Sequence, residues 1–233
     1  MQMFDRIRAI SLDLDDTLWP IQPTIERAEQ TLQEWLCRRA PRTRELLQDR
    51  PTMSRLREKA LRVSYEARHD LGAVRRESIR LLLTEAGEDP NLASAAYEVF
   101  FEARQRVTLF EGAGDALARL SQRFPLVALS NGNADIRRIG IAHHFRGSVS
   151  AADFGIAKPD PRIFWEAARL AGVAPDQVLH VGDDPALDVA GGHKAGLWVA
   201  WVNPARTPWD LNHKAPHLEI ESLSALCTHL GVP

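Results

Sequence analysis

The feature that most restricts the fold is an alternation of strands and helices that a long helical segment interrupts. Residues 7–14 (IRAISLDL) form an apolar run that ends in acidic residues, as a buried strand does. Beyond residue 108 the pattern predicts further strands at 125–130, near 147–151, at 178–184 and at 197–202. Helices are predicted between them, and a short strand and helix after a loop at 204–217. This order predicts an α/β fold, a Rossmann-like doubly wound parallel sheet with helices on both faces.

Helix boundaries in this part of the chain carry recognisable capping residues. Asp160 and Asp184 each precede a proline, the arrangement of an N-cap followed by proline at the first helical position. Gly172 and Gly196 are suited to end the same two helices. The alternation of strand and helix is therefore supported by local signals as well as by apolar runs.

The interrupting segment, about 24–105, is predicted to be helical throughout. Its apolar residues recur at helical spacing on otherwise charged stretches, as in a small helical bundle with its own core. The four stripes are Ile25, Ala28, Leu32, Trp35 and Leu36; Leu56, Ala60, Val63 and Ala67; Ile79, Leu82, Leu83 and Ala86; and Leu92, Ala95, Ala96, Val99, Phe100 and Ala103. We expect residues 1–19 and 108–233 to form one domain and 20–107 an inserted all-helical domain.

Composition excludes several classes of function. The chain of 233 residues has 29 basic and 31 acidic side chains, a formal charge of −2, which disfavours a nucleic-acid or membrane-surface binder. No apolar run approaches the ~20 residues of a membrane span, and the start lacks the apolar stretch of a signal peptide. Two cysteines, Cys37 and Cys227, make no disulfide framework. We expect a cytoplasmic protein, either a monomer or a homodimer.

Polar residues gather where the predicted strands end. Because the carboxyl ends of parallel strands share one edge of a sheet, we expect these residues to converge on a ligand site. They are Asp13, Asp15, Asp16 and Thr17; Ser130, Asn131 and Asn133; Asp183, Asp184 and Asp188; and Lys158 in the loop before Asp160.

The carboxylates at this edge require a compensating positive charge. Two like charges ~4 Å apart repel by about 4 kcal/mol at an effective dielectric constant of ~20. Oxygen ligands of this kind suit Mg²⁺, which often bridges to a substrate phosphate. The candidate ligands are Asp13, Asp15, Asp183, Asp184 and Asp188. Lys158, one of only four lysines, adds a compact fixed charge.

A magnesium ion, a lysine, a hydroxyl group and backbone amides beside a glycine are suited to hold a phosphoryl group. On an extended segment, residues i and i+2 point the same way, so Asp13 and Asp15 are able to face one reacting centre. One carboxylate can then attack phosphorus while the other acts as general acid and base.

Four segments, DLDDTLW, SNGN, KPDPRIF and HVGDDPALD, resemble in order the four motifs of the haloacid dehalogenase superfamily of phosphatases. The resemblance covers about 1–19 and 108–233, and the helical insert is similar to the superfamily's C1-type cap. The KPDPRIF region and the stretch from VGDD to PHLEI most resemble phosphatases of the flavin pathway. These act on flavin mononucleotide (FMN) and 5-amino-6-(5-phospho-ribitylamino)uracil.

The resemblance implies catalytic roles for four residues. Asp13 would be the nucleophile that forms an aspartyl-phosphate. Asp15 would protonate the leaving alcohol and then activate water, and its backbone carbonyl would bind Mg²⁺. Ser130 would hydrogen-bond the transferring phosphoryl group, and Lys158 would neutralise its charge and orient Asp13.

The resemblance also implies supporting roles. Asp183 would bind Mg²⁺ directly, whereas Asp184 and Asp188 would act through water or fix the loop. Thr17 and Asn131 would complete the phosphate site. Two alternatives remain open at this stage: Asp184 as a helix N-cap, and Trp19 either as a substrate contact or as packing at the junction with the insert.

Other functions compete with phosphatase chemistry. A 2-haloacid dehalogenase needs the nucleophile but neither Asp15 nor Mg²⁺, because halide leaves without a proton. A phosphomutase uses the same core, and a phosphonate hydrolase needs a cap lysine, for which only Lys59 is available. A non-catalytic phosphate-binding module would retain the fold without the reaction. Intact catalytic positions favour a phosphomonoester hydrolase that acts on a small phosphorylated metabolite.

Overall fold

A computed structural model describes residues 5–65, 69–209, 212 and 214–233. Ala67 and parts of the 204–217 loop lie outside these residues. The described chain forms two compact units, one of residues up to Pro20 together with Thr108–Pro233 and the other of Ile21–Val107. The first unit contains a six-stranded sheet. Its strands are β1 Ala9–Leu12, β2 Leu126–Ser130, β3 Gly147–Ser150, β4 Val178–Gly182, β5 Trp198–Val202 and β6 Leu218–Ile220.

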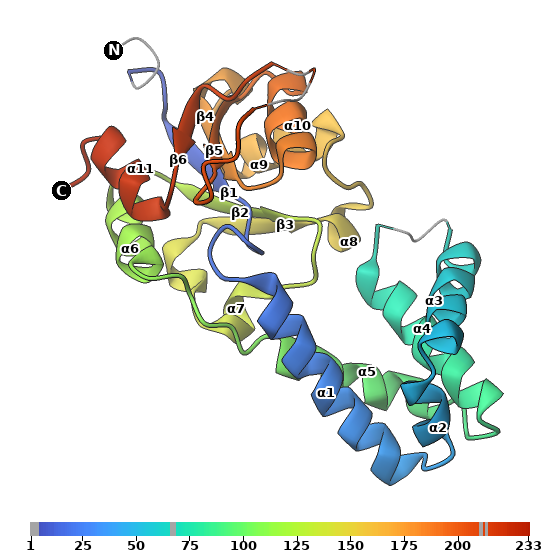
Figure 1. The fold of residues 1–233 in the computed structure, drawn as a ribbon. Helices are drawn as coiled ribbons and strands as arrows, with labels where there is room; N and C mark the ends of the chain where they lie inside the picture. The colour runs from blue at the N-terminus through green and yellow to red at the C-terminus, as the bar shows by residue number, and fades with distance from the viewer. Residues whose placement is uncertain (1–4, 66–68, 210–211, 213) are drawn as a thin grey trace. The chain divides into compact units, whose positions relative to one another are not determined.

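All six strands are parallel and lie in the order β3-β2-β1-β4-β5-β6 (Figure 1). The strand order reverses at β1, which lies between β2 and β4, and ligands of doubly wound sheets bind at such a reversal. In the register of the sheet, Leu12 pairs with Ala128 on one side and Val181 on the other. The predicted α/β class and parallel doubly wound sheet are therefore confirmed.

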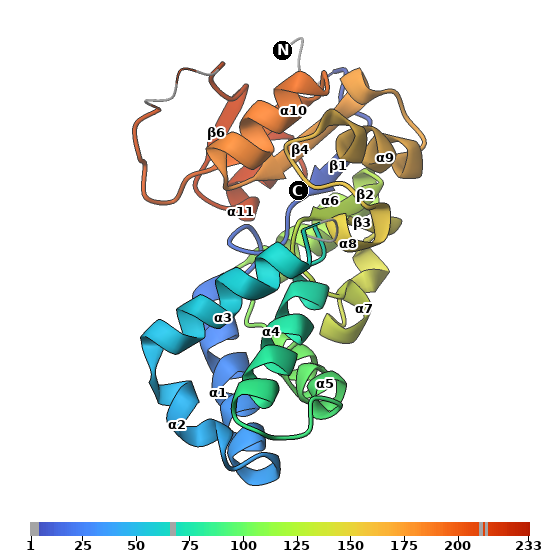
Figure 2. The same cartoon turned by 90° about the vertical axis from the view of Figure 1, so that its right-hand side faces the viewer.

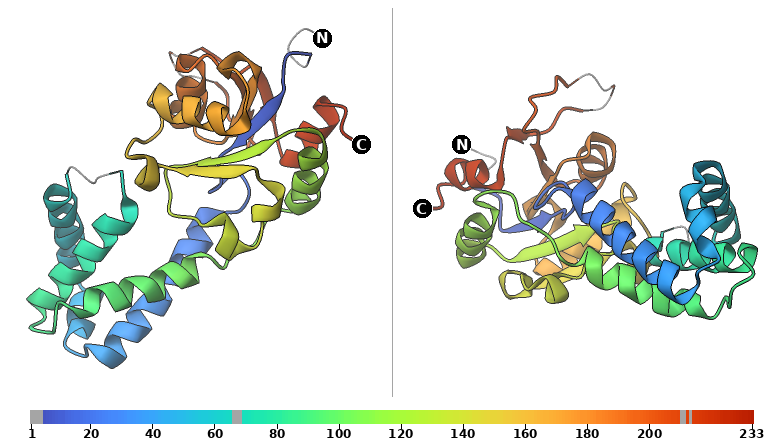
Figure 3. Two further views of the ribbon diagram at one scale, coloured as in Figure 1. Left: turned by 180° about the vertical axis from the view of Figure 1, so that it is seen from behind. Right: turned by 60° about the horizontal axis from the view of Figure 1, so that its bottom comes forward.

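Helices cover both faces of this sheet (Figure 1). One face carries α9 Pro161–Ala171 and α10 Ala190–Lys194, and the other α6 Ala113–Arg123 and α11 Leu223–His229. Short helices α7 Ile136–Ile139 and α8 Ala151–Phe154 flank β3 in sequence, and β2 and β3 run side by side in Figure 3. Beneath α9, the apolar side chains of β1, β2, β3 and β4 form a buried cluster.

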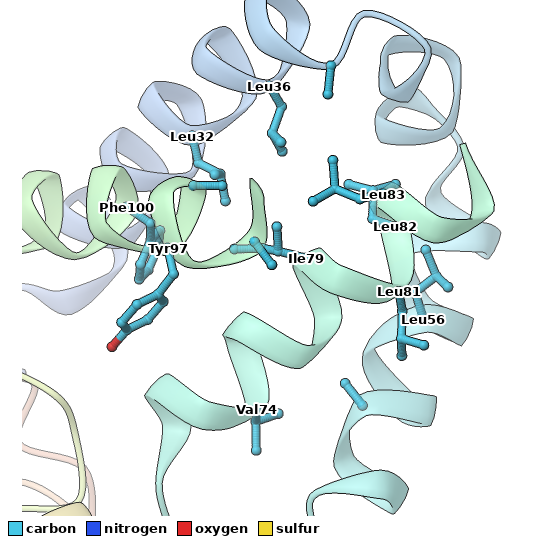
Figure 4. Packing of buried hydrophobic residues seen from close by; sticks show 14 of the residues in the cluster. Leu32, Leu36, Leu56, Val74, Ile79, Leu81, Leu82, Leu83, Tyr97 and Phe100 are labelled. Carbon is cyan, nitrogen blue, oxygen red and sulfur yellow. The ribbon is translucent and has the colours of Figure 1, made fainter. Parts of the chain in front are cut away.

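The second unit is helical, as its apolar stripes predict. Its helices are α1 Ile21–Arg39, α2 Thr43–Gln48, α3 Arg50–Val63, α4 Leu71–Glu85 and α5 Leu92–Arg104. α3 lies along α4 in Figure 2, and α1 lies along α5 in Figure 3. Figure 4 shows leucines of α1 and α4 converging on a common interior that Tyr97 and Phe100 of α5 help to close.

Three details of this unit differ from the sequence pattern. Val63 belongs to the second predicted stripe, yet it is 63% exposed. It is the last residue of α3, so no further turn of this helix follows to cover it. The separate short helix α2 precedes α3, and no stripe indicated it. Ala95 of the fourth stripe is exposed, because the buried face of α5 carries Ala93 and Ala96 instead. The other stripes agree with the buried cluster, which includes Leu32, Leu56 and Phe100.

The helix that begins after Asp184 departs from the expected geometry. Its first residues, Pro185–Val189, form a π-helical turn, and only then does α10 begin. Such turns are rare and are frequently found at functional sites. In the part of the chain that the structure describes, no helix is long and apolar enough to cross a membrane.

Candidate active site

Strands β1 and β4, neighbours at the point where the strand order reverses, are each followed by an aspartate. Asp13 directly follows β1, and its backbone N–H donates to the Val181 carbonyl of β4 at 2.9 Å. Asp183 directly follows β4. The ends of neighbouring parallel strands therefore place these two aspartates beside each other, although the whole helical unit and three strands separate them in the chain.

Lys158 lies between two carboxylates. Its Nζ donates to Asp13 Oδ1 at 2.5 Å and to Asp188 Oδ1 at 2.6 Å. The lysine side chain is 3% exposed, and Asp13 and Asp188 are likewise buried. An ammonium group has three donors, so this geometry leaves the third available to a substrate oxygen.

Asp188 is held by donors from three directions. Lys158 Nζ and His180 Nε2 both lie within hydrogen-bonding distance of its Oδ1, and the backbone N–H of Asp184 donates to its Oδ2 at 3.0 Å. The π-helical turn brings Asp188 so close to β4 that a Cβ at Gly182 would lie 2.3 Å from Asp188 Cγ. A glycine at 182 is therefore a steric requirement of this carboxylate.

Asn131 fixes the backbone of Lys158. Its Nδ2 donates to the Lys158 carbonyl at 3.0 Å, and its Oδ1 accepts the Lys158 N–H at 2.8 Å. Ser130, which is buried at the end of β2, accepts the Gly132 N–H on its Oγ at 2.9 Å. The amide of Asn131 thus positions the lysine loop, and its contact with a phosphate stays a prediction.

Two further contacts orient Asp183. Thr17 Oγ1 donates to Asp183 Oδ1 at 3.1 Å, so this hydroxyl positions a carboxylate, while its predicted contact with phosphate stays untested. Trp201 Nε1, on β5, donates to the Asp183 carbonyl at 2.7 Å. Side chain and backbone of Asp183 are therefore both held.

Asp15 lies on the turn that leaves β1 and is half-buried. Asp16 has φ of 57°, a left-handed conformation that Asp tolerates better than most residues. This turn allows Trp19 Nε1 to donate to Asp15 Oδ1 at 2.8 Å. Trp19 itself is fully buried, which agrees with the packing alternative for this residue.

Asp184 takes the role of a helix N-cap. Its Oδ1 accepts the backbone N–H groups of Ala186 and Leu187 at 2.7 and 2.9 Å. These bonds satisfy donors that a helix start leaves without partners. The N-cap alternative raised for Asp184 is thus present in the structure, and the predicted action of Asp184 on Mg²⁺ stays a prediction.

A cluster with the chemistry of a cation site emerges from these contacts. Among the described residues, Asp13, Asp183 and Asp188 form one group of candidate metal ligands whose oxygens lie within 4.8 Å of one another. Asp15 and Asp184 do not belong to that group. Three carboxylates against the ammonium of Lys158 leave a net charge of 1 − 3 = −2, which a divalent cation balances.

Burial and mutual charge shift the pKa values of this cluster. Burial, together with the charges of Asp188 and Asp183, raises the pKa of Asp13 despite the attraction of Lys158. Burial and Asp188 raise the pKa of Asp183 to about 6. For Asp188 the donors Lys158 and His180 outweigh burial and lower the pKa, and for Lys158 the two carboxylates outweigh burial and raise the pKa.

Sequence reasoning missed three residues that help to hold the site in place, namely His180, Ser11 and Trp201. His180 lies within the HVGDDPALD motif, but nothing in the pattern distinguished it from a core residue of β4. Ser11 and Trp201 likewise read as strand interior. A polar side chain within an apolar strand was the one available signal for His180 and Ser11, whereas the contact from Trp201 to a backbone carbonyl leaves no mark in the sequence.

Residues 7–196 match the family model of the haloacid dehalogenase-like hydrolases. The chain belongs to this family. The match spans β1 to α10 and so includes every residue of the cluster described above, as well as the helical insert.

Several known proteins are similar along most of the chain. It is 32% identical to 5-amino-6-(5-phospho-D-ribitylamino)uracil phosphatase YigB of Escherichia coli (strain K12), over 95% of each chain. It is 37% identical to a phosphoserine phosphatase of Thermus thermophilus, over 65% of this chain and 63% of that one. Among solved structures, a 2-haloacid dehalogenase from Pseudomonas syringae pv. Tomato DC3000 is similar, with a TM-score of 0.90, 37% identity, and coverage of 97% and 98%.

These comparisons confirm the resemblance drawn from the four motifs. The chain is a haloacid dehalogenase-like hydrolase whose relatives include phosphatases.

Proposed function

We propose that this hydrolase cleaves phosphomonoesters with the aid of Mg²⁺ and through an aspartyl-phosphate at Asp13. The observation that carries the proposal is the placement of Lys158 Nζ between Asp13 and Asp188, in a group of carboxylates able to hold a cation. A transferring phosphoryl group is stabilised by fixed positive charge and donors around it. Both are provided beside the same carboxylate.

In the first step an oxygen of Asp13 attacks phosphorus, and the bond from phosphorus to the leaving oxygen breaks. Lys158 holds Asp13 by one donor and meets the developing charge with another. The hydroxyl of Ser130, buried at the end of β2, donates to a phosphoryl oxygen. The phosphoryl group has then been transferred from the substrate alcohol to the carboxylate of Asp13.

Asp15 supplies the proton that the leaving alcohol needs. In the second step it takes a proton from water, which attacks phosphorus, releases inorganic phosphate and restores Asp13. Trp19 Nε1 donates to one oxygen of Asp15, at 2.8 Å, and so orients the carboxyl group for this proton transfer. The two aspartates thus divide the chemistry as nucleophile and general acid–base group.

The residues present fit a magnesium ion. Hard carboxylate oxygens from Asp13 and Asp183 suit it, and the −2 charge of the cluster matches it. We assign direct ligation to these two side chains and to the backbone carbonyl of Asp15. Asp188, whose oxygens already accept three donors, fits a positioning role better than a ligand role. When bound, Mg²⁺ supplies charge neutralisation for the phosphoryl oxygens.

A small phosphorylated metabolite is the proposed substrate class, with FMN or a riboflavin-pathway intermediate as the first candidates. The similarity to YigB over 95% of both chains supports this choice. The helical unit Ile21–Val107 is proposed as the cap that selects the leaving group. Within this unit, Arg75 forms an ion pair with Glu29 at 3.2 Å and stacks on Phe100. These contacts give Arg75 a structural role inside the helical unit.

Dehalogenation of a 2-haloacid is a second candidate, favoured by the similarity to the Pseudomonas syringae protein at 37% identity. This reaction forms an ester at Asp13 and releases halide, which needs no proton. It leaves Asp15 and Asp183 without a catalytic task. The donor arrangement around Asp183 favours the phosphatase.

Phosphate release from p-nitrophenyl phosphate, FMN and other phosphorylated metabolites tests the proposal, with halide release from 2-chloropropionate in parallel. Asp13→Asn should abolish turnover, and chelation of divalent metal should stop phosphate release. Asp15→Asn should lower kcat by about 10²–10⁴-fold on an alkyl phosphate. The loss should be smaller on p-nitrophenyl phosphate, because its leaving group departs more readily without a proton.

Asp16→Asn provides the matched control: the sequence places Asp16 with the converging residues, but in the structure its side chain is exposed, next to Asp15 on the same turn. It should retain wild-type turnover. Halide release that persists in Asp15→Asn and in the presence of chelator, with no phosphate release from any substrate, would replace the phosphatase with a dehalogenase.

A further inference from the structure

His180 occupies the centre of β4 and is fully buried. In the register of the sheet it pairs with Ser11 of β1, so the two side chains lie on one face. Its ring lies nearly perpendicular to that of Phe164 of α9, with ring centroids 4.9 Å apart. A histidine at such a position needs a reason, because burying polar atoms without partners costs free energy.

Both ring nitrogens of His180 have partners. Nε2 lies 3.0 Å from Asp188 Oδ1, and Nδ1 lies 2.9 Å from Ser11 Oγ. A carboxylate only accepts, so the Nε2 atom must carry a hydrogen. In a neutral imidazole Nδ1 is then bare and accepts the hydroxyl hydrogen of Ser11. Asp188 therefore sets the tautomer of His180, and Ser11 provides the hydrogen-bond donor that the bare Nδ1 needs.

The bond from His180 ends on the same oxygen that holds Lys158. Asp188 Oδ1 receives Nε2 of the histidine at 3.0 Å and Nζ of the lysine at 2.6 Å. The lysine in turn reaches Asp13 Oδ1 at 2.5 Å. The contacts thus connect Ser11 of β1, through His180, Asp188 and Lys158, to Asp13. We call this series of contacts the path.

We propose that His180 is a positioning residue, a neutral donor that fixes the carboxylate of Asp188 and through it the lysine that orients the nucleophile. This rests on the proposed function in that Asp13 and Lys158 perform the chemistry. His180 touches neither substrate nor reacting atoms. Its part is to keep Asp188 Oδ1 at one position, since only that oxygen is shared by the ring and the ammonium.

Two substitutions at this position separate the donor from the volume of the ring. His180→Phe removes both nitrogens and keeps an aromatic ring beside Phe164, whereas His180→Gln restores an N–H near the place of Nε2. The phenylalanine variant should lower kcat about 10–100-fold, the effect typical of removing an outer-shell partner, with KM within about two-fold. The glutamine variant should recover most of that loss.

Ser11→Ala tests the path with a milder change, because it removes only a hydroxyl. It leaves Nδ1 of His180 without its hydrogen-bond partner inside the protein and should lower kcat several-fold with KM unchanged. His193→Gln is the control, since this histidine bonds the Ala215 carbonyl and lies outside the path. It should behave as wild type. Wild-type kcat in His180→Phe or in Ser11→Ala, or an equal loss in both His180 variants, overturns the proposal.

A readout independent of turnover uses ¹⁵N-labelled histidine in the wild-type protein. Long-range ¹H–¹⁵N spectra at neutral pH should show His180 with hydrogen on Nε2 and none on Nδ1, and Ser11→Ala should change that signal. Hydrogen on Nδ1 alone would refute the assigned donor even if every His180 variant failed to fold. If the tautomer is as expected while no phosphate ester is hydrolysed, the proposed function fails and the positioning contact stands.

Discussion

Asp13, the proposed nucleophile, should make the metal-free protein less stable, and Asp13→Asn should therefore stabilise it while abolishing turnover. The charged oxygens of Asp13, Asp183 and Asp188 lie within 4.8 Å of one another, in a buried cluster. Each pair then repels by at least about 3.5 kcal/mol at an effective dielectric constant of ~20. The ion pair of Asp13 with Lys158, at 2.5 Å, contributes about 6.6 kcal/mol of attraction on the same scale.

The two repulsions together slightly exceed the attraction, and the cost of burying a charged carboxylate, several kcal/mol, adds to them. An asparagine removes this cost and still offers Oδ1 to the lysine. We expect a gain of about 1–2 kcal/mol in the free energy of unfolding, in the range typical of relieving a strained functional residue. For a chain of this size the melting temperature should rise by about 2–8 °C.

Chemical denaturation in EDTA measures this difference directly. The pKa of Asp13 is raised in the folded state, so its carboxyl contributes stability below the unfolded value, near 3.8, and loses it as pH rises through the folded pKa. The advantage of Asp13→Asn should therefore grow with pH. Mg²⁺ at about 100 times its Kd should add about 2.7 kcal/mol to the wild type and less to the variant.

Asp160→Asn is the matched control for the same chemical change. Asp160 caps α9, and its bonds with Arg162 lower its pKa to about 2, so its charge is favoured in the folded state. This variant should show no gain. An Asp13→Asn protein that is less stable than wild type in EDTA at neutral pH would refute the claim that the charged carboxylate of Asp13 destabilises the metal-free folded state.

Two further predictions concern steric fit and pH. Gly182→Ala should displace Asp188, destabilise the protein by about 1–3 kcal/mol and lower kcat at least about 10-fold; a fully active variant would contradict the contact found there. Burial, with His193 and Lys214, lowers the pKa of His217 to about 4, so stability present above the unfolded pKa of about 6.5 should fall as pH drops toward 4. In His217→Asn the free energy of unfolding should fall less steeply over this pH range, by at most about 1 kcal/mol, because the ring is partly exposed. A pH dependence from 4 to 7 identical to that of the wild type would contradict this role of His217.

The strand ends were predictable because sheet geometry leaves little choice. Once 7–14 and 178–184 are recognised as parallel strands, Asp13 and Asp183 must lie at one edge. Lys158 was expected at the same edge because its loop lies between two of these strands, and the family resemblance added the contact with Asp13.

The contacts that hold these residues in place were not predictable. Asn131 bonding the backbone of Lys158, and Trp201 bonding the carbonyl of Asp183, depend on distances of a few tenths of an ångström between elements distant in the chain. The π-helical turn that delivers Asp188 keeps the residue spacing of an ordinary helix start, so sequence shows the cap at Asp184 but not the altered winding.

The position of β1 at the centre of the sheet governs when the protein can first become competent during its synthesis. β1 is made early, yet its two neighbours, Leu126–Ser130 and Val178–Gly182, come after the whole helical unit. At ~5–20 residues per second, the ribosome delivers Val178 roughly 8–30 s after Leu12. The helical unit, being contiguous, is complete well before that. The nascent β1 can pair with β2 first, and the edge that carries both Asp13 and Asp183 is complete only when β4 has followed.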